Sequence, residues 1–212
     1  PTEKQRLFPP MAPAEGYHLS VLCRETDQAL AAARAGVSCV YLDLKNLREL
    51  APLTEQLRSE YPQTEIRIAT LRIMKPHEAG YFKYILAAEP DGVLVRNPGA
   101  AMFFRQKGIP MVGDFSLNTA NPQSVALWQQ FGMQLCTPSY DLNASQLADL
   151  LSSGCGPVLE LTLHQHIPMF HTEHCVFCTF LSQGHNFMDC GRPCEHHRVR
   201  VMDRTYAMHY LR

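Results

Sequence analysis

Short apolar segments alternate with longer amphipathic or alanine-rich segments along most of the chain. The apolar segments are five to seven residues long and rich in β-branched and aromatic residues, which is typical of strands. We expect strands at Leu19–Cys23, Ser38–Leu44, Glu65–Leu71, Asp91–Arg96, Pro110–Phe115, Met133–Thr137 and Pro157–Leu163. Six of these seven are followed by an expected helix, over Asp27–Ala35, Leu47–Glu60, His77–Ala88, Gly99–Lys107, Pro122–Phe131 and Ala144–Leu151.

Residues at the helix ends fit this assignment. Thr26, Asn121 and Asn143 are expected to cap three of the helices, because their side chains can accept a hydrogen bond from the first turn. Gly36 follows the first helix, where a left-handed residue commonly ends one.

Strands that alternate with helices predict a parallel sheet connected by right-handed crossovers, an α/β fold. The strands carry few charges and are mostly apolar, as expected when both faces of a sheet are covered. No G-x-G-x-x-G or G-x-x-x-x-G-K loop follows a strand, so a nucleotide-binding open sheet loses support. Seven near-equal units favour a TIM-barrel-like (β/α) barrel over residues 17–170, with an incomplete barrel as the variant that seven strands allow. Residues 1–16, with four prolines, are expected to be an irregular lead-in.

Residues 171–212 differ from the rest and are expected to form a Cys/His-rich, metal-binding extension. Cys175 and Cys178 form a C-x2-C pair, Cys190 and Cys194 form a C-x3-C pair, and eleven residues separate the pairs. Two such loops can bring four sulfurs to one metal centre. Glycine and proline near the second pair favour tight turns over a continuous helix.

The spacing leaves the bound group open. The four cysteines could hold an iron–sulfur cluster, or they could hold Zn²⁺, in which case one ligand could be His171, His174, His196 or His197. They could also be reduced thiols without a metal, whereas disulfides are disfavoured because nothing else looks secreted. The other cysteines are expected to be elsewhere: Cys23, Cys39 and Cys136 in strands as small core residues, and Cys155 in a turn without an obvious partner.

Active sites of such barrels lie at the C-terminal ends of the strands. Among the polar residues there, we single out Arg96, Asp114, Asn118 and Asn121 as candidate substrate-binding residues, although Asp114 and Asn118 could simply shape their loop. The catalytic candidates are Glu160, His164 and His166: if the last expected strand continues past Leu163, the two histidines alternate on it, point to one face and could form an inward polar set with Glu160. These histidines could equally be hydrogen-bonded at the rim without a chemical role. Neither H-E-x-x-H nor G-x-S-x-G is present.

The charge and the hydropathy of the chain limit the kinds of partner that we expect it to bind. The net charge of −1 gives no overall basic field for nucleic acid, but Arg192, Arg198, Arg200 and Arg204 cluster near the cysteines. That cluster is either a solvated surface or an RNA-binding patch. No apolar run reaches the roughly 20 residues of a membrane span, and no signal segment opens the chain, so a cytoplasmic location is expected. The start at Pro1 suggests part of a longer polypeptide.

Several segments resemble the peptidase U32 (collagenase-like protease) family. They are IPMFHTEHC followed by CGRPC near the C-terminus, and GDFSLNTANPQSVALWQQFG and CTPSYDLN upstream, and the resemblance extends over roughly residues 18–204. The family resemblance implies a TIM-barrel-like fold. Relatives that serve in oxygen-independent hydroxylation of RNA or of ubiquinone precursors hold a [4Fe-4S] cluster at this place.

The resemblance therefore implies a [4Fe-4S] cluster and a substrate that is RNA or a small aromatic molecule. The first pair here is the tighter C-x2-C, whereas relatives space their cysteines more widely, so the identity of the four ligands stays open. A U32-type peptidase is the alternative that the family name implies, although the sequence offers neither a nucleophile–base pair nor a catalytic zinc motif. A zinc-stabilised binding module is the third possibility.

Overall fold

The computed structural model describes residues 16, 18–165, 174–185 and 189–211. The chain divides into two compact units, Pro1–Leu163 and His164–Arg212, which are treated separately below. The expected lead-in over residues 1–16, apart from Gly16, lies outside the described residues. The expected boundary after residue 170 also lies outside them, so both stay predictions.

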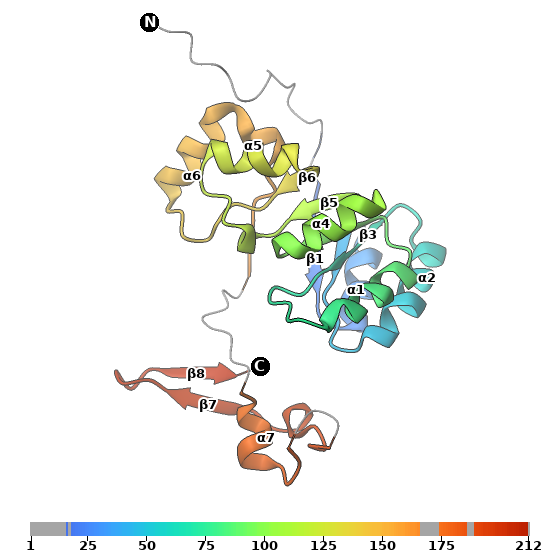
Figure 1. Cartoon of the computed structure of the whole chain (residues 1–212), viewed down its shortest axis with the longest axis vertical. Helices are drawn as coiled ribbons and strands as arrows, with labels where there is room; N and C mark the ends of the chain where they lie inside the picture. Colours follow the sequence, from blue (N-terminus) through green and yellow to red (C-terminus); the bar gives the residue numbers. More distant parts are fainter. Residues whose placement is uncertain (1–15, 17, 166–173, 186–188, 212) are drawn as a thin grey trace, which may run out of the picture. The chain divides into compact units, whose positions relative to one another are not determined.

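The first unit is a parallel sheet in which the strands follow one another in sequence order, β1-β2-β3-β4-β5-β6. A helix follows each strand, which confirms the α/β class (Figure 1). The strands are β1 (Ser20–Cys23), β2 (Cys39–Leu42), β3 (Glu65–Ala69), β4 (Gly92–Val95), β5 (Met111–Gly113) and β6 (Met133–Cys136). The helices are α1 (Thr26–Arg34), α2 (Leu50–Glu60), α3 (Tyr81–Ala87), α4 (Pro98–Lys107), α5 (Pro122–Gln130) and α6 (Ala144–Leu150).

Short helical turns complete this unit: η1 (Leu47–Glu49), η2 (Glu78–Gly80), η3 (Phe115–Leu117), η4 (Leu151–Cys155) and η5 (Gly156–Val158). Asn121 and Asn143 cap α5 and α6 as expected. Thr26 does not cap α1: it is the first helical residue, and its hydroxyl donates to Glu49 instead.

The expected seventh strand is wrong for most of its length. Pro157 and Val158 belong to the helical turn η5, and of the expected strand only Leu159 pairs, through one parallel bridge to Cys136. Gly156 and Pro157 explain the difference, because proline fits the first positions of a helical turn and lacks the N–H that a strand would donate. Among the described strands β1 and β6 are therefore edges, and a closed barrel is not shown.

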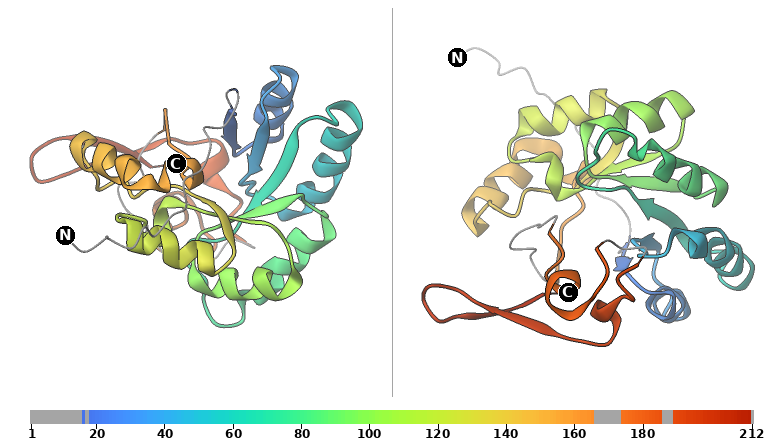
Figure 2. Two further views of the ribbon diagram at one scale, coloured as in Figure 1. Left: turned by 90° about the horizontal axis from the view of Figure 1, so that it is seen from above. Right: turned by 60° about the horizontal axis from the view of Figure 1, so that its bottom comes forward.

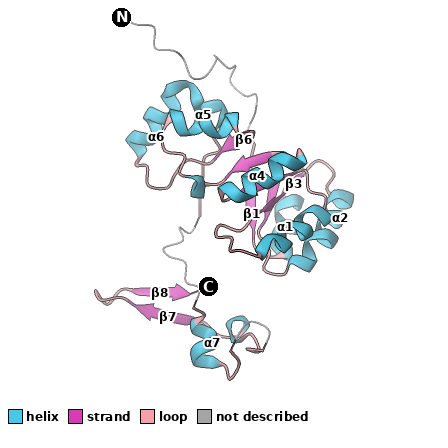
Figure 3. Cartoon of the chain, in the orientation of Figure 1, coloured by secondary structure: helices cyan, strands magenta, loops and turns pink. Residues whose placement is uncertain are grey.

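The two faces of the sheet carry different side chains because neighbouring residues on a strand point to opposite sides. One set, including Val40, Ile68 and Val95, packs with the buried residues of α1 to α4. The other set, including Tyr41, Leu94 and Val112, packs with strand residues only. Figure 2 shows the helices in an arc on the outer side of the sheet, and Figure 3 shows the same alternation by element type. Among the described residues of this unit, the sheet therefore has an outer face that helices cover and an inner face where only strand residues pack together.

Glu160 connects the two ends of the sheet across this inner face. Its backbone N–H donates to the carbonyl of Cys136, the last residue of β6, over 3.0 Å. Its carboxylate accepts hydrogen bonds from Ser20 Oγ of β1 (2.7 Å) and from Tyr41 OH of β2 (2.9 Å). A residue beside the last strand can reach the first two only if the sheet curls, so Glu160 ties the curled sheet together.

Arg67 of β3 forms a second polar group on the inner face. Its guanidinium donates to Glu65 Oε1 (Nε, 2.8 Å) and to Gln134 Oε1 (Nη2, 3.2 Å), and its side chain is buried. Gly92 pairs with Arg67 across the strands, and a Cβ on Gly92 would lie 2.9 Å from the carbonyl oxygen of Pro110. Only glycine fits that position without a shift of the neighbouring strand.

The second unit is small. It contains the helix α7 (Val176–Leu181), the helical turn η6 (Pro193–Glu195) and an antiparallel hairpin of β7 (Val199–Met202) and β8 (Met208–Leu211). Phe177 of α7 and Pro193 of η6 are its buried apolar residues among those described. Within the described parts of both units, no helix has the length and apolar character needed to cross a membrane.

The hydrogen bond from Tyr41 to Glu160 can be tested by stability. Replacing Tyr41 with Phe removes the donor but keeps the ring, and it should lower the free energy of unfolding by about 1.5–3 kcal/mol, because the acceptor is a carboxylate. Urea denaturation measures the change. Tyr84→Phe, at an exposed site on α3, is the matched control and should change the stability by less than about 0.5 kcal/mol. Equal effects of the two substitutions would show that the hydrogen bond from Tyr41 to Glu160 adds nothing to the stability of the protein.

Candidate functional site

Three charged residues meet at the C-terminal ends of β2, β4 and β5. Arg96 follows β4 and is buried, and its guanidinium donates to Asp43, which follows β2, with Nη1 at 3.0 Å from Oδ1 and Nη2 at 3.2 Å from Oδ2. Its Nε lies 3.4 Å from Asp114 Oδ2, an ion pair that falls short of hydrogen-bond geometry. Arg96 thus spans β3 and joins three strand ends.

Burial sets the electrostatics of this cluster. Burial raises the pKa of Asp114 above its ordinary value, and the positive charge of Arg96 offsets part of that rise. Burial and the charge of Asp43 raise the pKa of Tyr81 to about 12, so its hydroxyl stays protonated at neutral pH and donates to the carbonyl of Ala69. The second arginine near Asp43, Arg24, is largely exposed and lies 4.0 Å away.

Aromatic side chains lie next to the cluster in sequence and in space. Ser116 donates to Asp114 Oδ2 (3.1 Å) and to the carbonyl of Arg96 (2.9 Å), which fixes the start of η3. Phe115 of η3 stacks on Tyr140 with ring centroids 4.0 Å apart, and the guanidinium of Arg72 lies 5.8 Å from the centroid of Phe115. The C-terminal edge therefore combines a cluster of paired charges with a planar aromatic pair.

The other two candidate substrate-binding residues have structural positions. Asn118 ends η3 in the left-handed conformation, with φ of 54°, a geometry that asparagine tolerates better than most residues. Asn121 accepts a hydrogen bond from the N–H of Ser124 (2.8 Å) as the cap of α5. The structure brings Arg96 and Asp114 together, and places Asn118 and Asn121 in the loop and cap that follow.

The three catalytic candidates are not assembled by the described residues. Glu160 lies on the inner face of the first unit, whereas His164 belongs to the second unit and His166 lies outside the described residues. The catalytic role of this trio stays a prediction. Burial, and then the negative charge of Glu160, raise the pKa of Tyr41, which therefore remains a hydrogen-bond donor to Glu160.

Three of the four extension cysteines are neighbours. Cys175 caps α7, and its sulfur accepts a hydrogen bond from the N–H of Cys178 (3.4 Å). Desolvation raises the pKa of the Cys178 thiol, and the nearby Cys190 and Cys175 raise it further. Cys190 Sγ accepts a hydrogen bond from the N–H of Arg192 (3.4 Å). Cys194 lies on η6, which packs against α7.

The described residues on either side of 186–188, between the cysteine pairs, approach one another closely. Ser182 Oγ donates to the carbonyl of Cys190 (2.8 Å), and Cys178 Sγ contacts the carbonyl of Gly184 (3.4 Å). A Cβ added to Gly184 would lie 2.7 Å from the Cα of Cys190, so glycine is required for this approach. The packing explains why Cys190 lies near Cys178 although eleven residues separate them.

The four extension cysteines are suitable ligands for a metal ion or cluster that binds thiolates, although their side chains do not converge on one point. All eight cysteines are free, and the four in the extension are exposed or half-buried, unlike the four buried in the first unit. In the part of the chain that the structure describes, no three His, Cys, Asp or Glu side chains form a ready metal site. Of the histidine alternatives, His174 bonds to Thr179 and His197 to the carbonyl of Pro193, while His171 lies outside the described residues.

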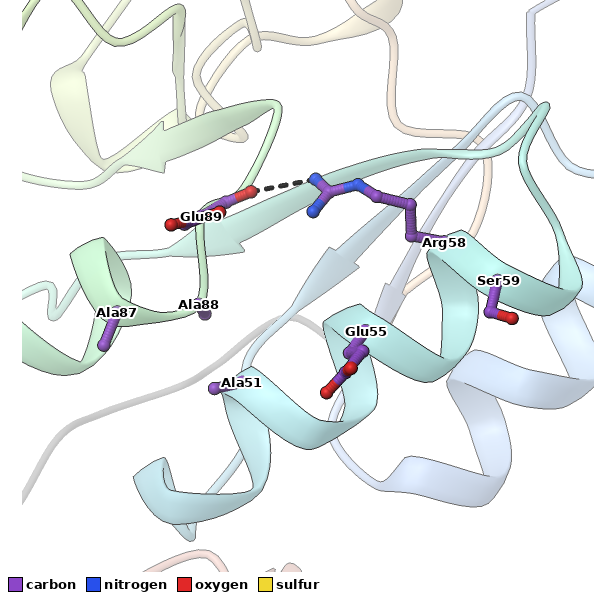
Figure 4. A pocket seen from close by; sticks show the side chains of 7 residues that line it. All are labelled: Ala51, Glu55, Arg58, Ser59, Ala87, Ala88 and Glu89. Carbon is purple, nitrogen blue, oxygen red and sulfur yellow. Dashed lines mark hydrogen bonds between the residues drawn. The ribbon is translucent and has the colours of Figure 1, made fainter.

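A surface hollow of about 450 Å³ lies between α2 and the end of α3 (Figure 4). Arg58 crosses it, donates to the carbonyl of Glu89 (2.8 Å) and pairs with Asp91 (3.2 Å). None of the predicted site residues lines it, and its arginine already has two partners within the chain.

Comparison with known proteins decides the family. The model of peptidase family U32 matches residues 24–205, most of the chain and both units. The chain belongs to peptidase family U32. The resemblance noted from the sequence is thereby confirmed, whereas the activity of this U32 chain is not resolved by family membership.

Other comparisons add little for the U32 chain. No curated protein matches it. Among solved structures, it is similar to a protein from Sorangium cellulosum described as a mandelate racemase/muconate lactonizing enzyme, with 13% sequence identity and a TM-score of 0.45. The similarity covers 68% of this chain and 45% of that chain, so the U32 chain spans less than half the length of that protein.

Sequence reasoning missed the polar residues of the inner face in this U32 chain. Ser20, Tyr41 and Arg67 lie within strands that the sequence predicts to be mostly apolar, and only their partners across the sheet explain them. The arginine in the EIRIA strand was the available signal, because a buried arginine needs acceptors from neighbouring elements.

The ion cluster makes a clear prediction for stability. Arg96→Met should leave Asp43 and Asp114 as facing carboxylates without their cation and should cost about 3–5 kcal/mol of unfolding free energy. Urea denaturation measures the loss, and carboxyl NMR should show the pKa of Asp114 rising further. Arg24→Met is the matched control, because that exposed arginine should contribute less than about 1 kcal/mol. Similar losses for both variants would contradict the arrangement.

Proposed function

We propose that this U32 chain holds a [4Fe-4S] cluster on Cys175, Cys178, Cys190 and Cys194 and takes part in hydroxylation without O₂. RNA or a small aromatic molecule is the proposed substrate, and the cytoplasm the proposed location. The observation that carries the proposal is that Cys175 and Cys190 both lie close to Cys178 in one small unit. Reduced thiols in such a group are common metal ligands in intracellular proteins.

Two backbone N–H groups support thiolate ligands. The N–H groups of Cys178 and Arg192 already donate to sulfurs of this set. Hydrogen bonds of this kind stabilise the negative charge on a ligating sulfur and tune the reduction potential of the bound group. When bound, a cluster would supply one-electron transfer.

The C-terminal edge of the sheet is the proposed substrate side. Arg96 is held by Asp43 and Asp114, so it fixes the strand ends and offers little free charge to an anion. The stacked pair of Phe115 and Tyr140 offers planar apolar surface, which suits a nucleobase or another aromatic ring. Because replacing C–H by C–OH removes two electrons from the substrate, the reaction also needs a two-electron acceptor: either an oxygen donor that is itself reduced, or a separate oxidant if water supplies the oxygen.

Proton transfer is assigned to Glu160, His164 and His166 as part of the proposal. Glu160 accepts hydrogen bonds from Ser20 and Tyr41, which hold its carboxylate in one orientation. Orientation by fixed donors is what a proton-transferring carboxylate needs.

Peptidase activity is the less favoured alternative. A cysteine nucleophile reacts as the thiolate, yet burial raises the pKa of Cys23 to about 11 and those of Cys39 and Cys136 to about 12. These thiols are core residues, as their strand positions predicted. Zinc on the four extension cysteines stays the alternative for a pure binding module.

The metal can be identified directly. The protein should be purified anaerobically and analysed for iron, sulfide and zinc, and a cluster should give roughly four irons per chain and broad absorbance near roughly 400 nm. Ser substitution of Cys175, Cys178, Cys190 or Cys194 should each remove most of the iron. Cys155→Ala is the matched control and should keep it, because Cys155 is buried in the other unit.

Two results would contradict the proposal. The first is a colourless sample with roughly one zinc per chain, which the four-cysteine zinc site predicts. The second is cleavage of casein or denatured collagen by the iron-free protein that is lost in a Glu160→Gln variant, since that result would support the peptidase.

A further inference from the structure

The β7–β8 hairpin has one face that no described residue of its unit covers. The register pairs Arg200 with Tyr210 and Met202 with Met208, so these four side chains share a face. All four are exposed, Tyr210 to 63%. On the opposite face, Val199 and His209 are half-buried. A two-stranded hairpin is marginally stable alone, which makes a persistent exposed aromatic face a sign of a partner.

The hairpin segment carries more basic than acidic side chains. Arg198, Arg200 and Arg204 have no acidic partner among the described residues. The nearby acid, Asp203, pairs instead with His209 (3.0 Å). Three unpaired arginines on one short hairpin attract a polyanion, although the whole chain carries a net charge of −1.

The tip of the hairpin is fixed by Asp203. Its Oδ1 accepts hydrogen bonds from the N–H groups of Thr205 (2.7 Å) and Ala207 (3.0 Å), and from the hydroxyl of Thr205 (2.7 Å). These bonds hold Tyr206 in the left-handed conformation, with φ of 66°, and leave its ring 80% exposed. The loop therefore presents a second aromatic ring at the tip without covering it.

We propose that the exposed face of this hairpin binds single-stranded RNA, with Tyr206 and Tyr210 stacking on bases and the three arginines binding phosphates. This proposal rests on the proposed function, which names RNA and a small aromatic molecule as the two substrate classes. Of these two, it selects RNA. Aromatic rings interleaved with unpaired arginines match single strands, whose bases are free to stack and whose backbone carries regular negative charge.

A protein partner fits this face less well. It would have to supply several carboxylates beside an apolar surface, whereas single-stranded RNA provides negative charge and planar rings together. Duplex RNA is also a poor match, because its bases are already stacked on each other.

Binding of a labelled single-stranded RNA of about 12 mixed-sequence nucleotides to the whole chain, followed by fluorescence anisotropy, tests the proposal. Tyr210→Leu keeps an apolar cross-strand side chain but removes the ring, and it should weaken binding roughly five- to hundred-fold. Tyr210→Phe should keep binding within about two-fold, because the ring remains. Arg200→Ala should lower the slope of log K against log salt by about 0.7.

Matched controls separate the hairpin from general surface effects. Tyr84→Leu and Arg48→Ala, at exposed sites of the other unit, should leave the affinity unchanged. Amide NMR signals of Thr205 and Ala207 report whether each hairpin variant keeps the loop bonded to Asp203. A variant with these signals intact and weaker binding supports the proposal.

Three outcomes would overturn the proposal: no binding of wild-type protein at about 50 mM salt, equal affinities for all variants, or tighter binding of the matched duplex. The cluster is measured independently by iron content. RNA binding that maps to the hairpin of an iron-free protein would refute the cluster alone, and a brown protein without RNA affinity would refute the hairpin proposal alone.

Discussion

A buried guanidinium organises the C-terminal edge of the sheet. Arg96 reaches across β3 to Asp43 and also contacts Asp114, so the ends of three strands are fixed by one side chain. A buried cation without partners is strongly disfavoured, and each carboxylate would likewise be disfavoured without the cation. The three residues therefore require one another, and this mutual requirement fixes the positions of the loops at the C-terminal edge of the sheet.

Glu160 plays the corresponding role on the inner face. It links the edge after β6 to β1 and β2, where direct strand pairing is missing among the described residues. The sheet of the first unit thus curls as the sheet of a barrel does, although a closed barrel is not shown. Polar side chains stabilise this curled arrangement. The exposed and half-buried thiols are confined to the other unit, because the four cysteines of the first unit are buried. The parallel sheet and the accessible sulfurs therefore belong to different units of this U32 chain.

The sequence predicts the repeating part of the fold well, because apolar periodicity and asparagine caps are local signals. Six strands and their helices follow from it, as do the core positions of Cys23 and Cys39. The seventh strand failed because the turn at Pro157 outweighs the apolar run after it. The pairing of Arg96 with Asp43, more than fifty residues away in sequence, could not be foreseen, since it depends on which strand ends the curl brings together.

Amide hydrogen exchange tests the rigidity of the C-terminal edge most directly. The N–H of Asp114 donates to the carbonyl of Val95 and the N–H of Thr70 to that of Leu94, each over 2.9 Å, at the edge that Arg96 fixes. If Arg96 organises this edge, both amides should exchange as slowly as the central residues of β4, through global unfolding. Fast exchange of both amides in the wild-type protein, with β4 still protected, would contradict the central role given to Arg96.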